Sequence, residues 1–274
     1  MEPPRYGRGS EHGWKETMSV LDSIIEGVKE DLESRRISRA QIQELVDKAA
    51  PPRADLQSFT NNSLSLIAEV KRSSPSKGSL APIADPALLA SRYEKGGASA
   101  ISVLTERRRF GGSLDDLDAV RKAVNLPILR KDFMVDQYQF YEARAHGADL
   151  VLLIVAALSK NQLSDYLALT EELGMHAIVE VHTHQELEIA LDNPCEMIGI
   201  NSRNLKTLDV DPVAFKELLP LIPSHLVRIA ESGISTPADV SFAVASGANA
   251  ILVGEALVRA GDPEFAVQHL LGHE

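Results

Sequence analysis

Short apolar runs alternate with longer, partly polar segments along most of the chain, from about residue 65 onward. The runs are rich in Val, Ile, Leu and Ala, and each starts roughly 20 to 35 residues after the previous one, the length of one strand followed by one helix. Eight strands are therefore predicted, over Ser65–Val70, Ala100–Leu104, Leu126–Arg130, Leu150–Val155, Ala177–Val181, Met197–Ile200, Leu226–Ala230 and Ala250–Val253.

The segments between the runs carry the start and stop signals of helices. Thr183 and Glu186 have the spacing of a capping box. Elsewhere a capping side chain directly precedes a proline, at Asp85-Pro86, Asp211-Pro212, Thr236-Pro237 and Asp262-Pro263. Three segments end in a glycine just before a strand, at Gly97, Gly147 and Gly247, where a left-handed residue can end a helix.

Repeated strand–helix units predict parallel strands joined by right-handed crossovers. Eight such units in about 205 residues fit a closed (β/α)8 barrel, for which about 250 residues are typical. The alternative, an open doubly wound sheet, usually shows a glycine-rich dinucleotide fingerprint after its first strand, and this sequence has none there. We therefore predict an α/β protein, a single (β/α)8 TIM barrel.

The residues before the first predicted strand form an N-terminal helical extension. The periodicity of Val20–Leu32 and of Ser38–Ala49 predicts two amphipathic helices. We expect residues 1–17 to be a flexible tail, residues 18–64 to be the helical extension packed on the barrel, and residues 65–274 to be the barrel. Met18 is an alternative start of the natural protein.

Composition and charge narrow the class of protein. A hydrophobic content of 44% excludes disorder as the dominant state. The formal net charge of −11 argues against nucleic acid as a partner, although a few local cations can still bind a small anion.

Cys195 is the only cysteine, so there is no disulfide framework, and its apolar neighbours predict a buried thiol. No run reaches the ~18 apolar residues of a membrane helix, and residues 1–17 lack the hydrophobic stretch of a signal peptide, so we expect a cytoplasmic protein with no membrane contact.

Charged side chains interrupt the apolar pattern where the predicted strands end, and barrel active sites lie at those ends. Glu69 and Lys71 share one face of the first strand with Ile67, so they can neutralise each other inside the barrel, as a functional pair or as an ordinary buried ion pair. Lys131 follows the third strand and shares the parity of Leu129, which predicts that it points inward.

Two of these groups are expected to have shifted pKa values. Lys131, if held among other cations or desolvated, would lose basicity and serve as an acid near neutral pH; the alternative is a solvated strand-end charge. Burial of Glu180 between two valines would raise its pKa towards the range of a general acid or base. Capping and solvation explain the neighbouring His182 and His184 better than a metal site, because no third ligand is in view.

The last three predicted strands end in groups that can bind an anion. These groups are Asn201 and Arg203 after the sixth strand, Ser232 and Gly233 after the seventh, and Gly254 and Glu255 after the eighth. Barrels often bind phosphate with the loops that follow strands seven and eight. A phosphorylated substrate is therefore predicted.

Five stretches at these strand ends resemble the indole-3-glycerol-phosphate synthases. They are Leu66–Leu80 with its Glu69-x-Lys71-x-x-Ser74-Pro75-Ser76 core, Leu129–Phe133, Val179–His182, Gly199–Leu205 and Ala230–Ile234. The resemblance covers Val20 to Gly272. It implies a barrel whose N-terminal extension lies over its mouth, and the conversion of 1-(2-carboxyphenylamino)-1-deoxyribulose 5-phosphate to indole-3-glycerol phosphate with loss of CO₂ and water. It also implies a place in tryptophan biosynthesis, with no metal or organic cofactor.

The resemblance implies a role for each candidate residue. Lys131 resembles the general acid on the carbonyl oxygen, and Lys71 the group that binds the anthranilate carboxylate and assists proton transfer, although which lysine serves which step stays open. Glu180 resembles the carboxylate of the later proton transfer and dehydration, and Glu69 the one that balances the lysines. Asn201 and Glu231 resemble catalytic residues that hold the substrate hydroxyls and the catalytic network. The remaining residues bind substrate: Arg203 the carboxylate, Phe110 and Phe133 the ring, Ser74, Ser232, Gly233, Gly254 and the Glu255 amide the phosphate, and Pro75 another part of the substrate.

Other readings of the sequence are weaker. A phosphoribosyl-anthranilate isomerase works with a different acid/base pair, and the first-strand motif argues against it. A fusion of the two enzymes would need more residues after Val253 than this sequence has, and a barrel kept as a binding scaffold would be expected to have lost one of the charged positions. The expected partner is a small phosphorylated substrate of a monomer, with contacts to other tryptophan-pathway enzymes left open.

Overall fold

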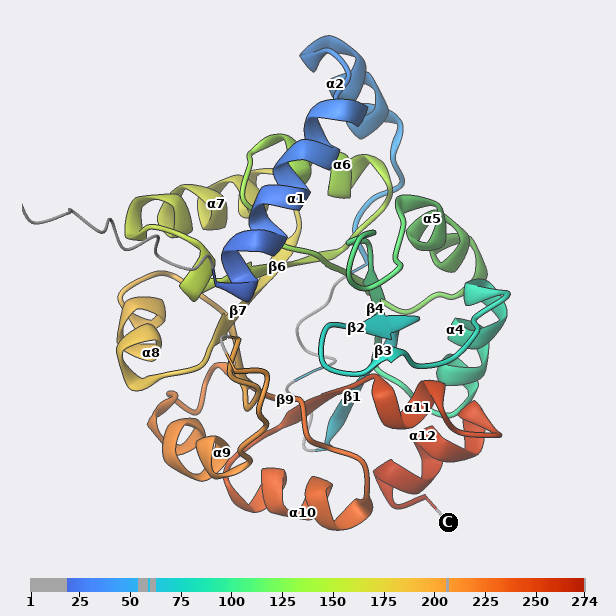
Figure 1. Ribbon diagram of the computed structural model, residues 1–274, viewed down its shortest axis with the longest axis vertical. Coiled ribbons are helices and arrows are strands. Elements are labelled where there is room, and N and C mark those ends of the chain that lie inside the picture. The colour runs from blue at the N-terminus through green and yellow to red at the C-terminus, as the bar shows by residue number, and fades with distance from the viewer. Residues whose placement is uncertain (1–18, 54–58, 60–62, 206, 274) are drawn as a thin grey trace, which may run out of the picture.

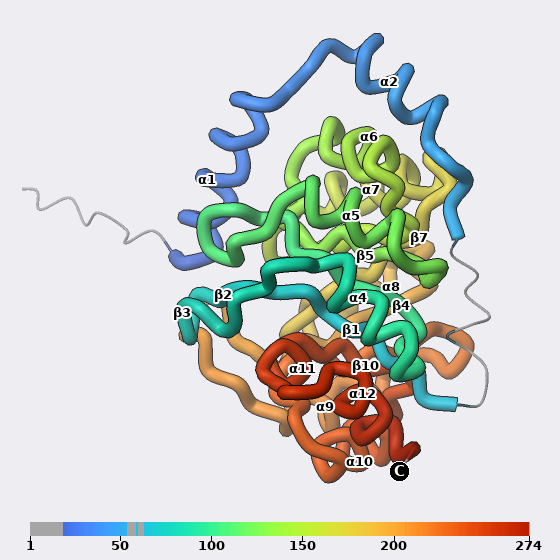
Figure 2. Tube along the Cα trace, turned by 90° about the vertical axis from the view of Figure 1, so that its right-hand side faces the viewer, coloured from blue at the N-terminus to red at the C-terminus, as the bar shows by residue number. Residues whose placement is uncertain are grey.

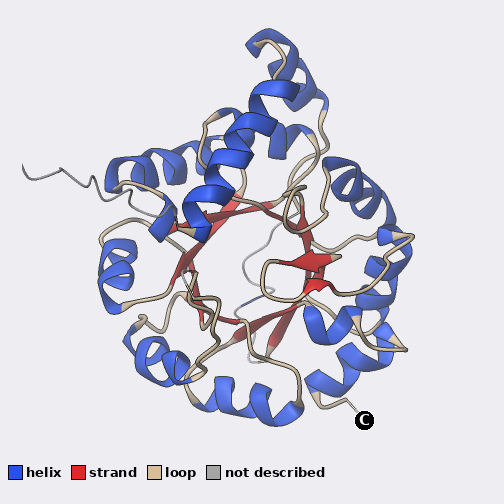
Figure 3. Ribbon diagram, viewed as in Figure 1, coloured by secondary structure: helices blue, strands red, loops and turns tan. Residues whose placement is uncertain are grey.

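The computed structural model describes residues 19–53, 59, 63–205 and 207–273, in which eight parallel strands close into a barrel surrounded by helices (Figures 1 and 3). The strands are β1 (Ser65–Val70), β4 (Ala100–Leu104), β5 (Ile128–Lys131), β6 (Leu150–Ile154), β7 (His176–Val181), β8 (Met197–Asn201), β9 (Val227–Glu231) and β10 (Ala250–Val253). Each pairs with its neighbours in chain order, and β10 closes the barrel on β1. The predicted (β/α)8 fold is confirmed.

Every predicted strand window contains a strand, but several boundaries differ. The third strand starts at Ile128, two residues later than predicted, and runs on to Lys131. The sixth and seventh each extend one residue further, to Asn201 and Glu231. Three candidate polar residues thus lie on the strands themselves, where the hydrogen-bonded barrel wall fixes their backbone.

The helices surround the barrel and begin largely where the capping signals predict. They are α4 (Pro86–Lys95), α5 (Leu114–Ala123), α6 (Tyr138–Ala145), α7 (Lys160–Glu172), α8 (His184–Leu191), α9 (Val213–Leu218), α10 (Pro237–Ala245), α11 (Glu255–Val258) and α12 (Pro263–Leu271), with short 3₁₀ turns η1 (Val155–Ala157) and η2 (Leu219–Leu221). Helix α9 starts one residue after its proline. At α8 the capping box is half formed, because Thr183 accepts from the Glu186 amide while the Glu186 carboxylate accepts from the amide of His182.

Buried side chains form two layers. The inner layer fills the barrel with inward-facing residues such as Ile67, Leu129 and Ile178, and the outer layer packs the strands against the helices. Inward-pointing Leu129 confirms the predicted orientation of Lys131, two residues along the same strand. Cys195 is buried in the outer layer, as predicted, and its thiol donates to the carbonyl of Ala190 at 3.4 Å.

Two N-terminal helices, α1 (Val20–Arg35) and α2 (Arg39–Lys48), precede the barrel. Figure 2 shows α1 at the same end of the barrel as the small β2–β3 hairpin. Helix α2 packs against α6. Ion pairs fasten α1 to the barrel: Arg35 Nε lies 2.8 Å from Glu142 Oε1 on α6, and Arg108 in the β4–α5 loop binds Asp31. The expected flexible tail at 1–17 and the alternative start at Met18 lie outside the described residues. None of the described helices is long and apolar enough to span a membrane.

The β2–β3 hairpin was not predicted from the sequence. Its strands are only two residues each, Ser73–Ser74 and Gly78–Ser79, too short to leave a periodic signal. It follows β1 directly and stands over the open end of the barrel (Figure 1). The segment that carries Ser74 and Pro75 is therefore held in a defined turn.

Candidate active site

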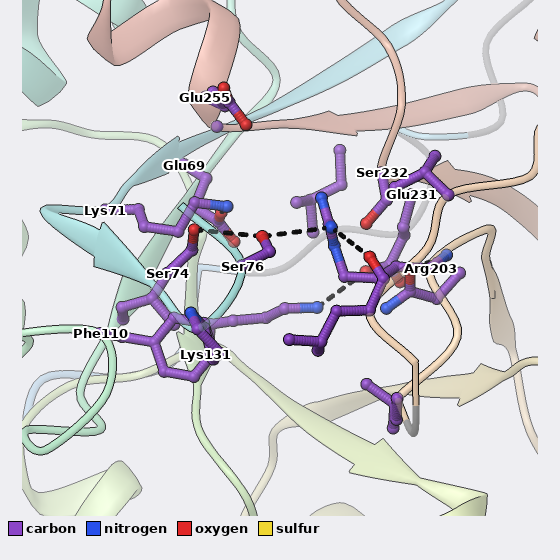
Figure 4. Close-up of a pocket in the computed structure, with 18 of the residues that line it drawn as sticks. Glu69, Lys71, Ser74, Ser76, Phe110, Lys131, Arg203, Glu231, Ser232 and Glu255 are labelled. Atoms are coloured by element: carbon purple, nitrogen blue, oxygen red, sulfur yellow. Dashed lines mark hydrogen bonds and ion pairs between the residues drawn. The ribbon is translucent and has the colours of Figure 1, made fainter. Parts of the chain in front are cut away.

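A cavity of about 600 Å³ opens at the carboxyl ends of the strands. Its walls contain every candidate residue of the sequence analysis: Glu69, Lys71, Ser74, Pro75, Phe110, Lys131, Phe133, Glu180, Asn201, Arg203, Glu231, Ser232, Gly233, Gly254 and Glu255. Figure 4 shows Lys71 and Lys131 entering from one side, with Arg203, Glu231 and Ser232 on the other. The barrel thus gathers groups that are up to 186 residues apart in sequence, Glu69 and Glu255 being the ends of that range.

Lys131 spans the floor of the cavity between two carboxylates. Its Nζ lies 2.9 Å from Glu180 Oε2 on β7 and 2.7 Å from Glu231 Oε2 on β9. Both glutamate side chains are about 2% exposed, and Lys131 is 14% exposed. Two acids therefore share one cation in a site from which most water is excluded.

The pKa shifts in this group differ from those expected from the sequence. Burial alone would lower the pKa of Lys131, but the charges of Glu180 and Glu231 outweigh it and raise that pKa above its usual range, so the predicted loss of basicity is wrong. Burial likewise opposes ionisation of Glu180, yet Lys131 and His182 hold its pKa well below the ordinary value, which is the reverse of the prediction. Glu231 is the carboxyl whose pKa rises, to about 7, through burial and the nearby charge of Glu180.

Glu69 and Lys71 form the expected pair on β1. Lys71 Nζ lies 2.6 Å from Glu69 Oε1, and Ser102 on β4 donates to the other carboxylate oxygen at 3.4 Å. The carboxylate lies against Gly254 at the end of β10, where an added Cβ would be 3.2 Å from Glu69 Cδ and closer still to Oε1. The glycine thus makes room for the Glu69 side chain.

Arg203 crosses the mouth of the cavity opposite the lysines. Its guanidinium donates to the carbonyl of Leu208 at 2.9 Å and to Ser76 Oγ at 3.3 Å, and Ser76 lies 3.5 Å from Ser74 (Figure 4). Asn201 Oδ1 accepts from the Arg203 amide at 3.0 Å. The β2–β3 hairpin and the loop after β8 are therefore linked across the cavity.

The loop after β9 turns its backbone into an unusual conformation. Ser232 has φ 69° and Gly233 has φ 74°, so two successive residues are left-handed, which is rare for a residue with a side chain. A Cβ at Gly233 would also meet Val210 Cγ1 at 2.7 Å. Strain of this kind persists where surrounding structure imposes it, and here it faces the cavity.

The apolar part of the cavity comes from loops and from α1. Phe110 and Phe133 lie with their ring centroids 6.2 Å apart, and Leu21 and Ile24 of α1 also line the space. The loop of Phe110 is ordered by the buried Glu106, whose carboxylate accepts from three successive backbone amides, including that of Phe110 at 2.9 Å. A flat aromatic group could pack against these side chains.

Several lining residues were missed by sequence reasoning. Val20, Leu21 and Ile24 read as the apolar face of a helix, and nothing in their pattern shows that the face covers a cavity. Lys77 and Arg259 also line it, and both lie near Glu255, with Lys77 Nζ 2.7 Å from Glu255 Oε1. Lys77 and Arg259 could have been found from the sequence, because each basic residue lies a few residues after a predicted strand end.

Known proteins resemble this chain over nearly its whole length. The family model of indole-3-glycerol phosphate synthase matches residues 21–270. The indole-3-glycerol phosphate synthase of Paenarthrobacter aurescens is 60% identical over 90% of this chain and 93% of its own length, and that of Micrococcus luteus is 57% identical over 92% and 96%. The solved structure of 3-hexulose-6-phosphate synthase from Salmonella typhimurium, at 15% identity and a TM-score of 0.61, covers 77% of this chain and 100% of that one, and it shares the fold. This chain belongs to the indole-3-glycerol phosphate synthase family.

Proposed function

We propose that the cavity at the strand ends is where this chain carries out the reaction of its family, closing the indole ring of 1-(2-carboxyphenylamino)-1-deoxyribulose 5-phosphate. The reaction is that of a carboxy-lyase: an aromatic carbon attacks the ketone, CO₂ leaves and restores aromaticity, and loss of water gives indole-3-glycerol phosphate. It needs an acid at the ketone oxygen, an acid and a base for the dehydration, and a fold of the substrate that brings carbon to carbonyl.

Anchors at opposite ends of the cavity bend the substrate. The phosphate binds at the strand ends of β9 and β10, at Ser232, Gly233, Gly254 and the Glu255 amide, with Ser74 and Pro75 of the hairpin beside it. The carboxylated ring packs against Phe110 and Phe133, with its carboxylate near Arg203 and Lys71. Supporting this orientation, Figure 4 shows Phe110 and Ser232 on opposite sides of the 600 Å³ cavity.

Lys131 is the general acid, and its position between Glu180 and Glu231 is the observation that carries the proposal. Its raised pKa keeps the ammonium protonated at neutral pH, so it transfers the proton only as the ketone oxygen becomes an alkoxide. Glu231 has a pKa of about 7 and lies 2.7 Å away, so it can return a proton to Lys131 afterwards.

The other charged groups complete the cycle. Glu180 stays ionised and is the base that removes a proton from the new five-membered ring during dehydration, while Lys131, reprotonated by Glu231, protonates the hydroxyl so that it leaves as water. Lys71, paired with Glu69, holds the substrate carboxylate until CO₂ leaves, and Asn201 binds a substrate hydroxyl. Lys131 rather than Lys71 is assigned to the acid step because only Lys131 bridges two carboxylates that can exchange protons with it.

The test is turnover of the purified chain on the carboxyphenylamino-deoxyribulose phosphate, followed by indole absorbance. Lys131→Ala should lower kcat by about 10²- to 10⁴-fold, the usual contribution of a general acid, with the substrate Kd from calorimetry changed only a few-fold. Lys71→Ala should raise Kd more than it lowers kcat. Exposed Lys95 on α4 is the matched control, and Lys95→Ala should behave as wild type. Near-normal kcat in Lys131→Ala would reject the acid assignment.

The proposed working form is a cytoplasmic monomer. In support of a reducing compartment, the single cysteine is a buried free thiol. Sedimentation at micromolar concentration should give the mass of one chain, and a stable dimer would contradict this part of the proposal.

A further inference from the structure

His182 stands next to the proposed base without lining the cavity. It follows β7 directly, its side chain is 9% exposed, and its Nε2 lies 3.3 Å from Glu180 Oε1. Its other ring nitrogen, Nδ1, lies 3.1 Å from Glu186 Oε2 in the first turn of α8. The same Glu186 oxygen accepts from the His182 amide at 2.8 Å, which ties the ring and its backbone to one carboxylate.

These contacts add His182 and Glu186 to the row of charged side chains formed by Glu180, Lys131 and Glu231. In order along it come Glu186, His182, Glu180, Lys131 and Glu231. Glu180 has a cation at each oxygen, His182 at Oε1 and Lys131 at Oε2. Glu231, by contrast, depends on Lys131 alone for its cation among the ion pairs of the described residues.

We propose that His182 is a positioning residue for this reaction: doubly protonated and held by Glu186, it fixes the carboxylate of Glu180 in the cavity and keeps the shared proton on Glu231. The inference rests on the proposed role of Glu180 as base. Nδ1 makes a hydrogen bond to Glu186, and Nε2 lies at ion-pair distance from Glu180 without a hydrogen bond. A carboxylate oxygen at each ring nitrogen favours the doubly protonated imidazolium form.

Electrostatics agrees with this geometry. Burial alone would lower the pKa of His182, but Glu180 and Glu186 outweigh it and raise the pKa to about 9. Those two carboxylates form the ion pairs of the ring, and Lys131 is a like charge on the far side of Glu180. The adjacent strands β6 and β8, and η1, which packs on α8, contribute no charged side chain there. Without the imidazolium, Glu180 and Glu231 would compete for Lys131 on nearly equal terms, and the proton would be divided between them.

The decisive variants are His182→Gln and Glu186→Gln, with His184→Gln as the matched control, since His184 is exposed two residues further along. For His182→Gln we expect kcat at pH 7 to fall about tenfold because Glu180 loses its fixed position, and KM to change less than threefold. Loss of the imidazolium should also move the acid limb of the kcat–pH profile, which reports the ionisation of Glu180, to higher pH. Glu186→Gln should give a smaller shift in the same direction. A His182→Gln profile that superimposes on wild type would overturn the inference.

Imidazole NMR measures the protonation of the His182 ring directly. It needs neither enzyme turnover nor a correctly folded His182→Gln variant. In the wild-type protein the His182 ring should keep both protons from pH 6 to 8, and in Glu186→Gln it should begin to titrate in that range. A ring that titrates near its ordinary value in the wild type would also overturn the inference. Glu180→Gln separates the two proposals: if it stays active, the role of Glu180 fails, whereas an inactive Glu180→Gln with an unaffected His182→Gln rejects only the role of His182.

Discussion

A substitution at Gly199 on β8 tests how tightly the barrel interior packs around the carboxylate of Glu231. Gly199 lies on the strand next to that of Glu231, and a Cβ added at Gly199 would lie 3.1 Å from Glu231 Cδ and within overlap of its Oε1. It would also lie 3.3 Å from Ile178 Cγ2, so the barrel interior leaves little room for the methyl group to escape. The backbone at Gly199 is not left-handed, so the added atom itself is the perturbation.

Gly199→Ala therefore has to move the Glu231 carboxylate by about 1 Å, which breaks its 2.7 Å contact with Lys131. A displacement of about 1 Å in catalytic geometry costs about 100-fold in rate, and overpacking of this kind destabilises by about 1–3 kcal/mol. We expect kcat to fall about 100-fold while circular dichroism stays native. The matched control is Gly261→Ala, because a Cβ there meets nothing within 4 Å.

A double-mutant cycle with Glu231→Asp identifies the cause. Aspartate is one methylene shorter, so its carboxylate withdraws from the added methyl group, and the double variant should be far less impaired than the product of the two single effects. Gly199→Ala with near-wild-type kcat, or strictly multiplicative effects in the cycle, would refute the close fit of Gly199 and Glu231.

Two further predictions concern stability. Glu231 has a pKa of about 7 in the folded chain against 4.5 when unfolded, so the folded state holds the extra proton between these values and its stability falls as pH rises through this window. Between pH 4.5 and 7.5 the urea-derived stability of wild type should lose up to about 3 kcal/mol relative to Glu231→Gln, and parallel curves would contradict the shift. Glu142→Ala leaves the fully buried Arg130 with one carboxylate partner fewer and releases Arg35, so it should cost about 3–5 kcal/mol. The exposed Glu196→Ala, which removes a surface contact to His176, should cost under about 1 kcal/mol, and equal losses in the two variants would show that the Glu142 cluster contributes no more than a surface pair.

The fold was predictable because its signals are local. Strand windows, proline-linked caps and the glycines before strands each depend on a few neighbouring residues, and Gly97, Gly147 and Gly247 do adopt the left-handed conformation expected of them. The candidate residues could also be located, because in a parallel barrel every strand end reaches the same face. The elements that were not predicted are short, such as the two-residue strands of the β2–β3 hairpin.

The pKa values were not predictable because their causes lie far away in sequence. A loss of basicity was predicted for Lys131, from nearby cations or from desolvation, but its contacts are two glutamates, 49 and 100 residues further along. The burial of Glu180 was inferred correctly from its valine neighbours, yet two cations outweigh burial there. Strand order around the barrel, and not the flanking residues, determines which charges meet.

Glu180 and Glu231 are chemically identical and equally buried, and both contact the same lysine, so the difference between them must come from a third group. His182 is that group: it lies beside Glu180, and the ion pairs of the described residues place no second cation at Glu231. Glu180 is therefore ionised at neutral pH, whereas Glu231 takes up a proton as the pH falls through about 7, with Lys131 in contact with both. A reaction that first needs a proton at an oxygen and later needs one removed from carbon is served by this asymmetry, because acid and base are present together before the substrate arrives.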